Sequence, residues 1–199
     1  MLASCEQNIS NTTRMSLRTL VCKQRVTRWK LALFYALFVS LGFTLRADDW
    51  PHWRGPQRNG VSAETGWLAT WPADGPPIAW KAKVGLGFSS FAVAQGRAFT
   101  MGHANGQDTV WCFDAASGKI IWKHSYPAEL GDKYFEGGTT GTPTVAGDRV
   151  FTLSRWGDVF CFEATSGKII WSKNVQKETG VRIPDWGFAG APLVQENLL

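Results

Sequence analysis

From about residue 87 onward, short apolar runs alternate with turns that contain glycine and acidic residues. The run 110–113 leads into a turn that Asp114 opens and that contains Gly118, and residues 119–122 begin the return strand. Short runs of β-branched and aromatic residues bounded by such turns are typical of β-strands. Asp114 opens the turn, where its carboxylate can accept bonds from backbone amides, and Gly118 lies where the loop requires a positive φ. The pattern predicts a β-hairpin.

The same pattern returns 49 residues later, with Glu163 in the place of Asp114. Upstream, residues 91–100 align with 143–152 at an offset of 52, so the first copy has three extra residues between 102 and 109. That segment has turn composition, and we expect the extra residues to form a longer loop. Each unit has room for four short strands, and four strands in a period of about 45–50 residues are typical of a propeller blade. The sequence therefore predicts an all-β fold, a β-propeller of four-stranded antiparallel blades.

The repeated motif Asp/Glu-Ala-x-Ser-Gly-Lys-x-x-Trp resembles the repeat of pyrroloquinoline-quinone-type (PQQ-like) β-propellers. In that family the turn glycine and the strand tryptophan form a docking girdle between adjacent blades. The resemblance assigns these structural roles to the following residues of this chain: Asp114, Gly118 and Trp122 in one blade, Glu163, Gly167 and Trp171 in the next, and Trp80 in a preceding, incomplete unit.

Residues 48–77 contain many prolines and glycines, and prolines are not found in central strands. We expect an irregular leader pinned by its four tryptophans, Trp50, Trp53, Trp67 and Trp71. Its opening, 49–56, resembles the leader of exported bacterial PQQ-like proteins, some of which are polyvinyl-alcohol-dehydrogenase-like. His52 and Arg54 could line a site, but the favoured interpretation is that they help to dock the leader.

Residues 1–47 carry seven Lys and Arg against one acid, whereas residues 48–199 carry 14 against 15. The basic character therefore belongs to the N-terminal segment. Residues 48–199 lack the excess positive charge that would favour nucleic-acid binding. A 13-residue apolar core, 31–43, follows the basic stretch, as in a signal peptide. We expect export to the periplasm or the exterior, with Met1 or Met15 as the start. The alternatives are an uncleaved membrane anchor and a buried core helix.

Residues 190–199 match 141–150 at the 49-residue offset, so a third unit begins near residue 189. We expect blades at about 87–126 and 139–175, and only about 2.5 units in residues 78–199. Since closed propellers have at least four blades, the sequence favours an N-terminal fragment whose C-terminal blades are missing. The alternatives are a truncated gene product and one part of a split assembly. Residues 78–83 are expected to be a closing strand.

Two connections between units, 126–141 and 174–190, are candidate contact loops, because propellers bind ligands on their faces. The first contains the segment 134–138, and the second contains Arg182, Asp185 and Trp186. A protein or polymer ligand could bind there. The alternative is that these loops only bridge strands.

Chemistry-bearing residues are few. Cys112 and Cys161 occupy equivalent positions a blade apart and are expected to be small buried apolar side chains, not a disulfide. Asp158, Asp185 and Asn105 are possible calcium ligands, although acids in turns are usually solvated or capping. No metal site and no catalytic residue is predicted, and the three histidines show no ligand spacing.

Three functions remain open after these observations. The first is an exported PQQ-like propeller that acts as a binding or assembly scaffold without a catalytic site. The second, implied by the resemblance, is the N-terminal part of a PQQ-dependent, polyvinyl-alcohol-like alcohol dehydrogenase, which would use PQQ and calcium. The third is a truncated product without an independent function.

Overall fold

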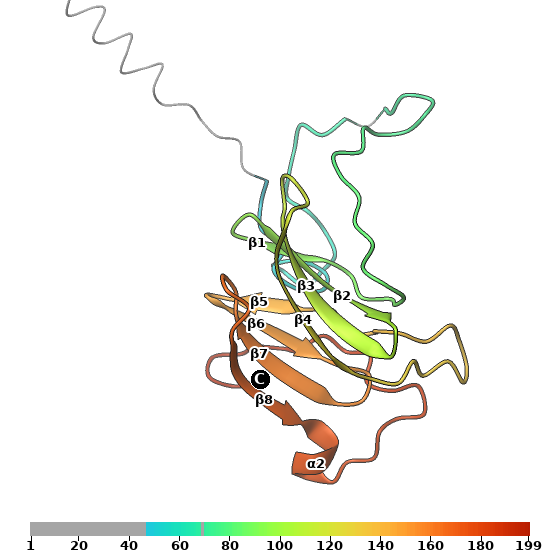
Figure 1. Ribbon diagram of the computed structural model, residues 1–199. Coiled ribbons are helices and arrows are strands. Elements are labelled where there is room, and N and C mark those ends of the chain that lie inside the picture. The colour runs from blue at the N-terminus through green and yellow to red at the C-terminus, as the bar shows by residue number, and fades with distance from the viewer. Residues whose placement is uncertain (1–46, 69) are drawn as a thin grey trace, which may run out of the picture. The chain divides into compact units, whose positions relative to one another are not determined.

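The computed structural model describes residues 47–68 and 70–199, so the predicted signal peptide lies, apart from Ala47, outside the described residues. The first sheet contains four antiparallel strands in sequence order (Figure 1): β1 (Ala92–Ala94), β2 (Arg97–Ala104), β3 (Gln107–Asp114) and β4 (Ile120–Pro127). The second sheet repeats this order: β5 (Thr144–Ala146), β6 (Arg149–Leu153), β7 (Asp158–Glu163) and β8 (Ile169–Asn174). A short helix, α2 (Val175–Thr179), follows β8. The predicted fold, an incomplete β-propeller of four-stranded blades, is confirmed.

The two sheets repeat each other in detail. Cys112 pairs with Trp122 across β3 and β4, and Cys161 pairs with Trp171 across β7 and β8. In both sheets the register shifts directly after the cysteine. The repeated sequence thus reproduces the same local irregularity, which twists the outer hairpin of each blade more strongly.

The corner between β3 and β4 is closed by backbone hydrogen bonds. The Asp114 amide donates to the Lys119 carbonyl at 2.8 Å, and the Gly118 amide donates to the Asp114 carbonyl at 2.9 Å. Gly118 has a φ of 71°. The amide and hydroxyl of Ser117 donate to the Asp114 carboxylate at 2.8 and 2.6 Å. These bonds hold the pKa of Asp114 below its usual range, because they stabilise the ionised form.

The prediction of a longer loop in the first blade is wrong. β2 and β3 are joined by a two-residue turn, Asn105-Gly106, whose φ values are 54° and 72°. An Asn-Gly pair favours this geometry because its twist matches that of the flanking strands. β2 and β3 have eight residues each, whereas β6 and β7 have five and six, so the two strands of the first blade are five residues longer in total. The turn between them is two residues shorter than the connection 154–157 of the second blade, which leaves the net difference of three.

A tryptophan from one unit rests on a glycine of the next. The Trp80 indole donates to the Ala115 carbonyl at 3.0 Å, and a Cβ on Gly118 would lie 2.5 Å from the Trp80 ring. The Trp122 indole repeats the arrangement one unit later: it donates to the Ala164 carbonyl at 2.9 Å and faces Gly167 at the same 2.5 Å. We refer to each of these pairs as a tryptophan lock.

The apolar core lies between the two sheets. Phe99, Met101 and Val110 from the first sheet form one buried cluster with Val150 and Phe162 from the second. β1 and β5, the first strands of the two sheets, are in contact. Trp122 belongs to the same cluster, packing on Phe99 and Phe162 with ring centroids 5.9 and 5.5 Å away. Trp122 thus forms a tryptophan lock with the second unit and is also part of the apolar core.

The leader is held mainly by hydrogen bonds to the first strand of each sheet. Trp50 and Val93 exchange two backbone hydrogen bonds of 2.7 and 2.8 Å, and the Val145 amide donates to the Pro51 carbonyl at 2.7 Å. The leader therefore bonds to β1 and β5 in turn. Trp53, Trp67 and Trp71 are exposed, so the expectation that all four tryptophans pin the leader is wrong.

Two further segments form no sheet strand. Residues 78–83, the expected closing strand, are outside both sheets, and Trp80 is fixed by its lock instead. In the expected third unit, Gln195 and Leu198 form only an isolated bridge. Among the described residues, no helix has the length and apolar character needed to cross a membrane. The proposed domain boundaries at residues 47 and 77 stay predictions.

The tryptophan lock predicts that alanine substitution destabilises the fold by different amounts at two glycines that share the same backbone conformation. Gly167 and Gly106 both have a φ of 72°, but a Cβ on Gly106 would meet nothing within 4 Å. Both alanine variants should lose about 1 kcal/mol to backbone strain. Gly167→Ala should lose about 1–3 kcal/mol more, because its methyl group displaces Trp122. Urea denaturation curves of the two variants measure this difference, and equal midpoints would show that the lock does not stabilise the fold.

Candidate binding face

The two candidate contact loops meet. The ring of Trp186, from the second connection, lies 4.7 Å from Tyr134 and 6.0 Å from Phe135, both from the first. Phe135 also packs edge-on against Phe88 at 5.5 Å. Trp186 remains 58% exposed and Tyr134 45%. Phe88, Tyr134, Phe135 and Trp186 form what we call the aromatic cluster.

A buried arginine supports the aromatic cluster. Arg155 is only 3% exposed, and its guanidinium lies 4.5 Å from the Phe135 ring and 5.5 Å from the Trp156 ring. A Cβ on Gly131 or Gly187 would collide with the arginine, so both connections approach it closely. Its Nε and Nη1 have no hydrogen-bond partner among the described residues. Cation–π attraction to the two rings partly offsets the cost of burying the charge.

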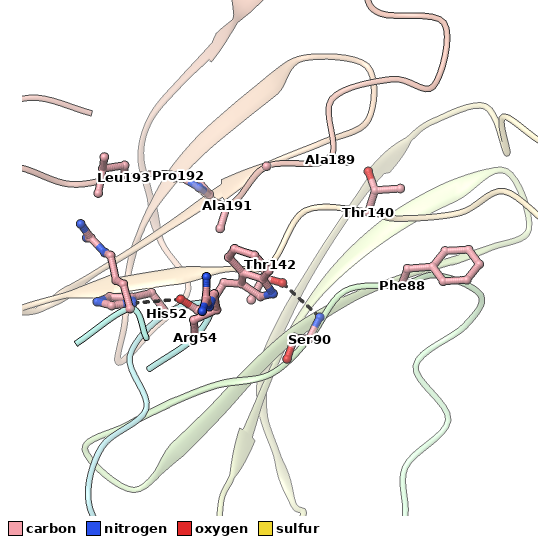
Figure 2. Close-up of a pocket in the computed structure, with 13 residues that line it drawn as sticks. His52, Arg54, Phe88, Ser90, Thr140, Thr142, Ala189, Ala191, Pro192 and Leu193 are labelled. Atoms are coloured by element: carbon pink, nitrogen blue, oxygen red, sulfur yellow. Dashed lines mark hydrogen bonds between the residues drawn. The ribbon is translucent and has the colours of Figure 1, made fainter. Parts of the chain in front are cut away.

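A pocket of about 660 Å³ lies beside the aromatic cluster and shares Phe88 with it. The leader supplies the side chains of His52, Arg54 and Arg58 to its lining. Figure 2 shows His52 and Arg54 near Thr142 and Ser90, with Ala191 and Pro192 on another side. The structure thus brings the two leader residues singled out in the sequence, His52 and Arg54, to one site. We call it the leader pocket.

Successive units contribute equivalent positions to the leader pocket. Phe88, Thr140 and Ala189 are related by the offsets of 52 and 49 residues that relate the strands, as are Ser90, Thr142 and Ala191. The Ser90 amide donates to the Thr142 hydroxyl at 3.1 Å, which ties the first two segments together (Figure 2). Equivalent positions of successive units thus line one part of the pocket, and the leader lines another.

The lining of the leader pocket contains basic groups and no carboxylate. Arg54 and Arg58 have left-handed backbones, with φ values of 67° and 54°. Such conformations cost a residue with a Cβ roughly 1 kcal/mol or more and tend to occur at functional sites. Arg54 donates to the Asn59 carbonyl at 3.1 Å, and its guanidinium lies 5.6 Å from the Trp53 ring. The pocket is chemically suited to an anionic group.

The possible calcium ligands are dispersed. Asp158 accepts hydrogen bonds from Ser154 at 3.0 Å and Asn174 at 2.8 Å, Asp185 pairs with Arg182 at 2.8 Å, and Asn105 lies in a hairpin turn. Within residues 47–68 and 70–199, no three His, Cys, Asp or Glu side chains are placed to hold a metal ion. The donor groups described do not fit a calcium site.

Sequence reasoning missed a buried pair. His103 and Asp108 face each other across the β2–β3 hairpin, with Nδ1 and Oδ1 2.8 Å apart. Burial raises the pKa of Asp108, while the hydrogen bond from His103 opposes the shift. Tyr126 is also buried, and its pKa is raised by burial and by the Asp108 and Asp158 carboxylates. The Asn-Gly turn was the available signal, because it fixes which residues of the two strands pair.

The two cysteines and His124 lie in packed surroundings that fit a structural role. Cys112 and Cys161 are free and buried. Burial raises the pKa of Cys112 to about 12 and also raises that of Cys161. His124 stacks among Tyr126, Phe160 and Phe162, and burial lowers its pKa.

Paired four-stranded blades joined by tryptophan locks define a PQQ-like repeat β-propeller. A family model described as outer membrane protein assembly factor BamB matches residues 61–140 and 109–199, which together are more than half of the chain. The chain belongs to this family. No curated protein matches the sequence.

Several solved structures are similar to parts of the chain. BamB from Moraxella catarrhalis is 15% identical over 43% of this chain and 23% of that chain, with a TM-score of 0.33. A europium-containing methanol dehydrogenase is 24% identical over 44% and 15%, with a TM-score of 0.34. The quinohemoprotein alcohol dehydrogenase ADHIIG from Pseudomonas putida HK5 is 20% identical over 58% and 16%, with a TM-score of 0.42. The chain matches less than a quarter of the length of each.

The cysteine environment makes a prediction about reactivity. Only a thiolate reacts readily with a maleimide, and a thiol with a pKa near 12 is almost fully protonated at about pH 8. Cys112 should therefore stay unlabelled in the folded protein and react in concentrated guanidinium chloride. Mass spectrometry of the peptides containing Cys112 and Cys161 measures the labelling. Rapid labelling of Cys112 in the folded protein would contradict the packing described above.

Proposed function

We propose that this chain is part of an exported propeller that acts as a binding scaffold, and that a protein partner contacts the aromatic cluster. The observation that carries this proposal is the meeting of Tyr134 and Phe135 with Trp186, from separate connections, in a position that leaves large ring surface exposed. Tryptophan, tyrosine and arginine are the residues most enriched at the energetic centres of protein interfaces.

The packing beneath the aromatic cluster supports the interpretation that the two connections bind a partner and do not only connect strands. Loops that only connect strands have no need to gather large rings at the surface. Here Arg155 fixes Phe135 from below, and the Phe188 amide donates to the Arg155 carbonyl at 2.9 Å. The rings are therefore pre-organised, which lowers the entropy lost when a partner binds.

The family description is consistent with this role, since it names an assembly factor for outer membrane proteins. Export is part of the proposal. It rests on the basic stretch and 13-residue apolar core in residues 1–47, which lie, apart from Ala47, outside the described residues. A periplasmic or extracellular location follows if this segment acts as a signal peptide.

The alternative is the N-terminal part of a PQQ-dependent alcohol dehydrogenase. One observation favours it: the leader pocket presents Arg54 and Arg58, which could pair with the carboxylates of a quinone cofactor. Dye-linked alcohol oxidation by the full-length gene product, with PQQ and calcium added, distinguishes the two functions. The scaffold proposal expects no turnover that depends on PQQ.

Site-specific crosslinking tests the scaffold proposal directly. A photoreactive amino acid at position 134 or 186 of the full-length protein, expressed in its own cells, should give one discrete protein adduct. The same amino acid at position 177, on exposed α2, is the control and should give none. Trp186→Ala should greatly reduce the adduct from position 134, because it removes a ring next to Tyr134. Equal adducts at all three positions, or none at 134 and 186, would contradict the proposal.

A further inference from the structure

The leader pocket specifies the chemistry of what binds beside the aromatic cluster. We propose that the pocket binds an acidic segment of the protein partner, with its carboxylates on Arg54 and Arg58 and its apolar side chains toward Phe88. This inference rests on the proposed scaffold function and adds a second contact to it, the recognition of negative charge.

Charge complementarity selects an acidic ligand. Two guanidiniums and an imidazole line the pocket without a carboxylate, and no ion pair within the described residues involves Arg54 or Arg58. Two acids of the leader already accept hydrogen bonds elsewhere: Asp49 accepts one from the Gln95 amide at 3.0 Å, and Glu64 accepts one from the Asp48 amide at 2.7 Å. A carboxylate can pair with a guanidinium through two parallel hydrogen bonds.

The turn that carries the arginines is held by hydrogen bonds within its own backbone. Backbone bonds close it at three points: Gly55 to His52 at 3.0 Å, Arg58 to Gly55 at 2.9 Å, and Gly60 to Arg54 at 2.9 Å. The bonds of Trp50 and Pro51 to β1 and β5 fix the chain directly before it. Both arginines occupy backbone conformations that glycine would adopt without strain. This arrangement fixes the backbone positions from which both arginines line the pocket.

The remainder of the lining favours a peptide over a simple anion. Trp53, Phe88 and Leu193 give the pocket an apolar portion, which inorganic phosphate could not use. Phe88 also contacts Phe135, so the pocket is continuous with the aromatic cluster. A peptide that combines carboxylates with an aromatic side chain matches both portions, whereas a nucleic acid would meet a chain whose residues 48–199 carry no net positive charge.

The test measures binding of a short peptide to the full-length protein by fluorescence anisotropy. The probe is dye-labelled Glu-Glu-Phe-Glu-Glu, and its twin with glutamine in place of every glutamate reports the apolar contribution alone. The acidic probe should bind, the glutamine twin should bind about tenfold more weakly, and raising NaCl from about 0.05 M to about 0.5 M should weaken only the acidic probe.

Matched variants locate the binding. The double variant Arg54→Gln/Arg58→Gln should weaken the acidic probe about tenfold, since each exposed pair contributes a modest amount. Lys173→Gln/Lys177→Gln removes the same charge from β8 and α2, away from the pocket, and should leave binding unchanged. Arg54→Lys/Arg58→Lys retains the charge and should recover part of the affinity. Unchanged thermal melting of each variant shows that the fold is intact.

Each other outcome overturns the inference in its own way. Equal loss in both double-glutamine variants would mean that the probe follows overall charge rather than the pocket. Competition by inorganic phosphate as strong as by the unlabelled peptide would indicate a general anion site. No binding of the acidic probe, together with intact crosslinks at positions 134 and 186, would reject the acidic segment and leave the scaffold function standing. Loss of those crosslinks alone would reject the scaffold function.

Discussion

The arrangement of this protein depends on an indole ring placed on a glycine. Each tryptophan lock needs three features of the next unit at once: a free backbone carbonyl, a glycine without a Cβ and a turn that presents both. Trp122 satisfies them with Ala164 and Gly167 while its ring also packs on Phe99 and Phe162. Because losing a buried aromatic side chain typically costs about 3–5 kcal/mol, the contact contributes strongly to stability and fixes how neighbouring blades sit.

The blades could be predicted from the sequence because the features that define them are local and are repeated. A turn glycine and an acidic residue recur at one offset, and the strands on both sides follow from them. The predictions that proved wrong concern segments whose local composition is compatible with two different structures. Asn105-Gly106 has the composition of a loop but makes a tight turn that extends the strands. The tryptophans of the leader suggested a buried segment, yet backbone bonds from Trp50 and Pro51 hold it.

The candidate binding face was only partly predictable, because its residues come from segments far apart in sequence. The two connections could be identified as candidate contact loops, but no local signal shows that Trp186 packs on Tyr134. Arg155 lies in a turn between β6 and β7, where an arginine is usually solvated, and its burial follows from the approach of Gly131 and Gly187. Such long-range contacts exist only after the units have packed.

The leader links stability to binding through one continuous backbone. Its first residues, Trp50 and Pro51, bond to β1 and β5, and the next turn carries the basic groups of the pocket. A segment that bonds to both sheets is positioned only when the sheets have docked correctly. The positive side of the pocket therefore forms together with the tryptophan locks, and the proposed binding site depends on correct docking of the two sheets.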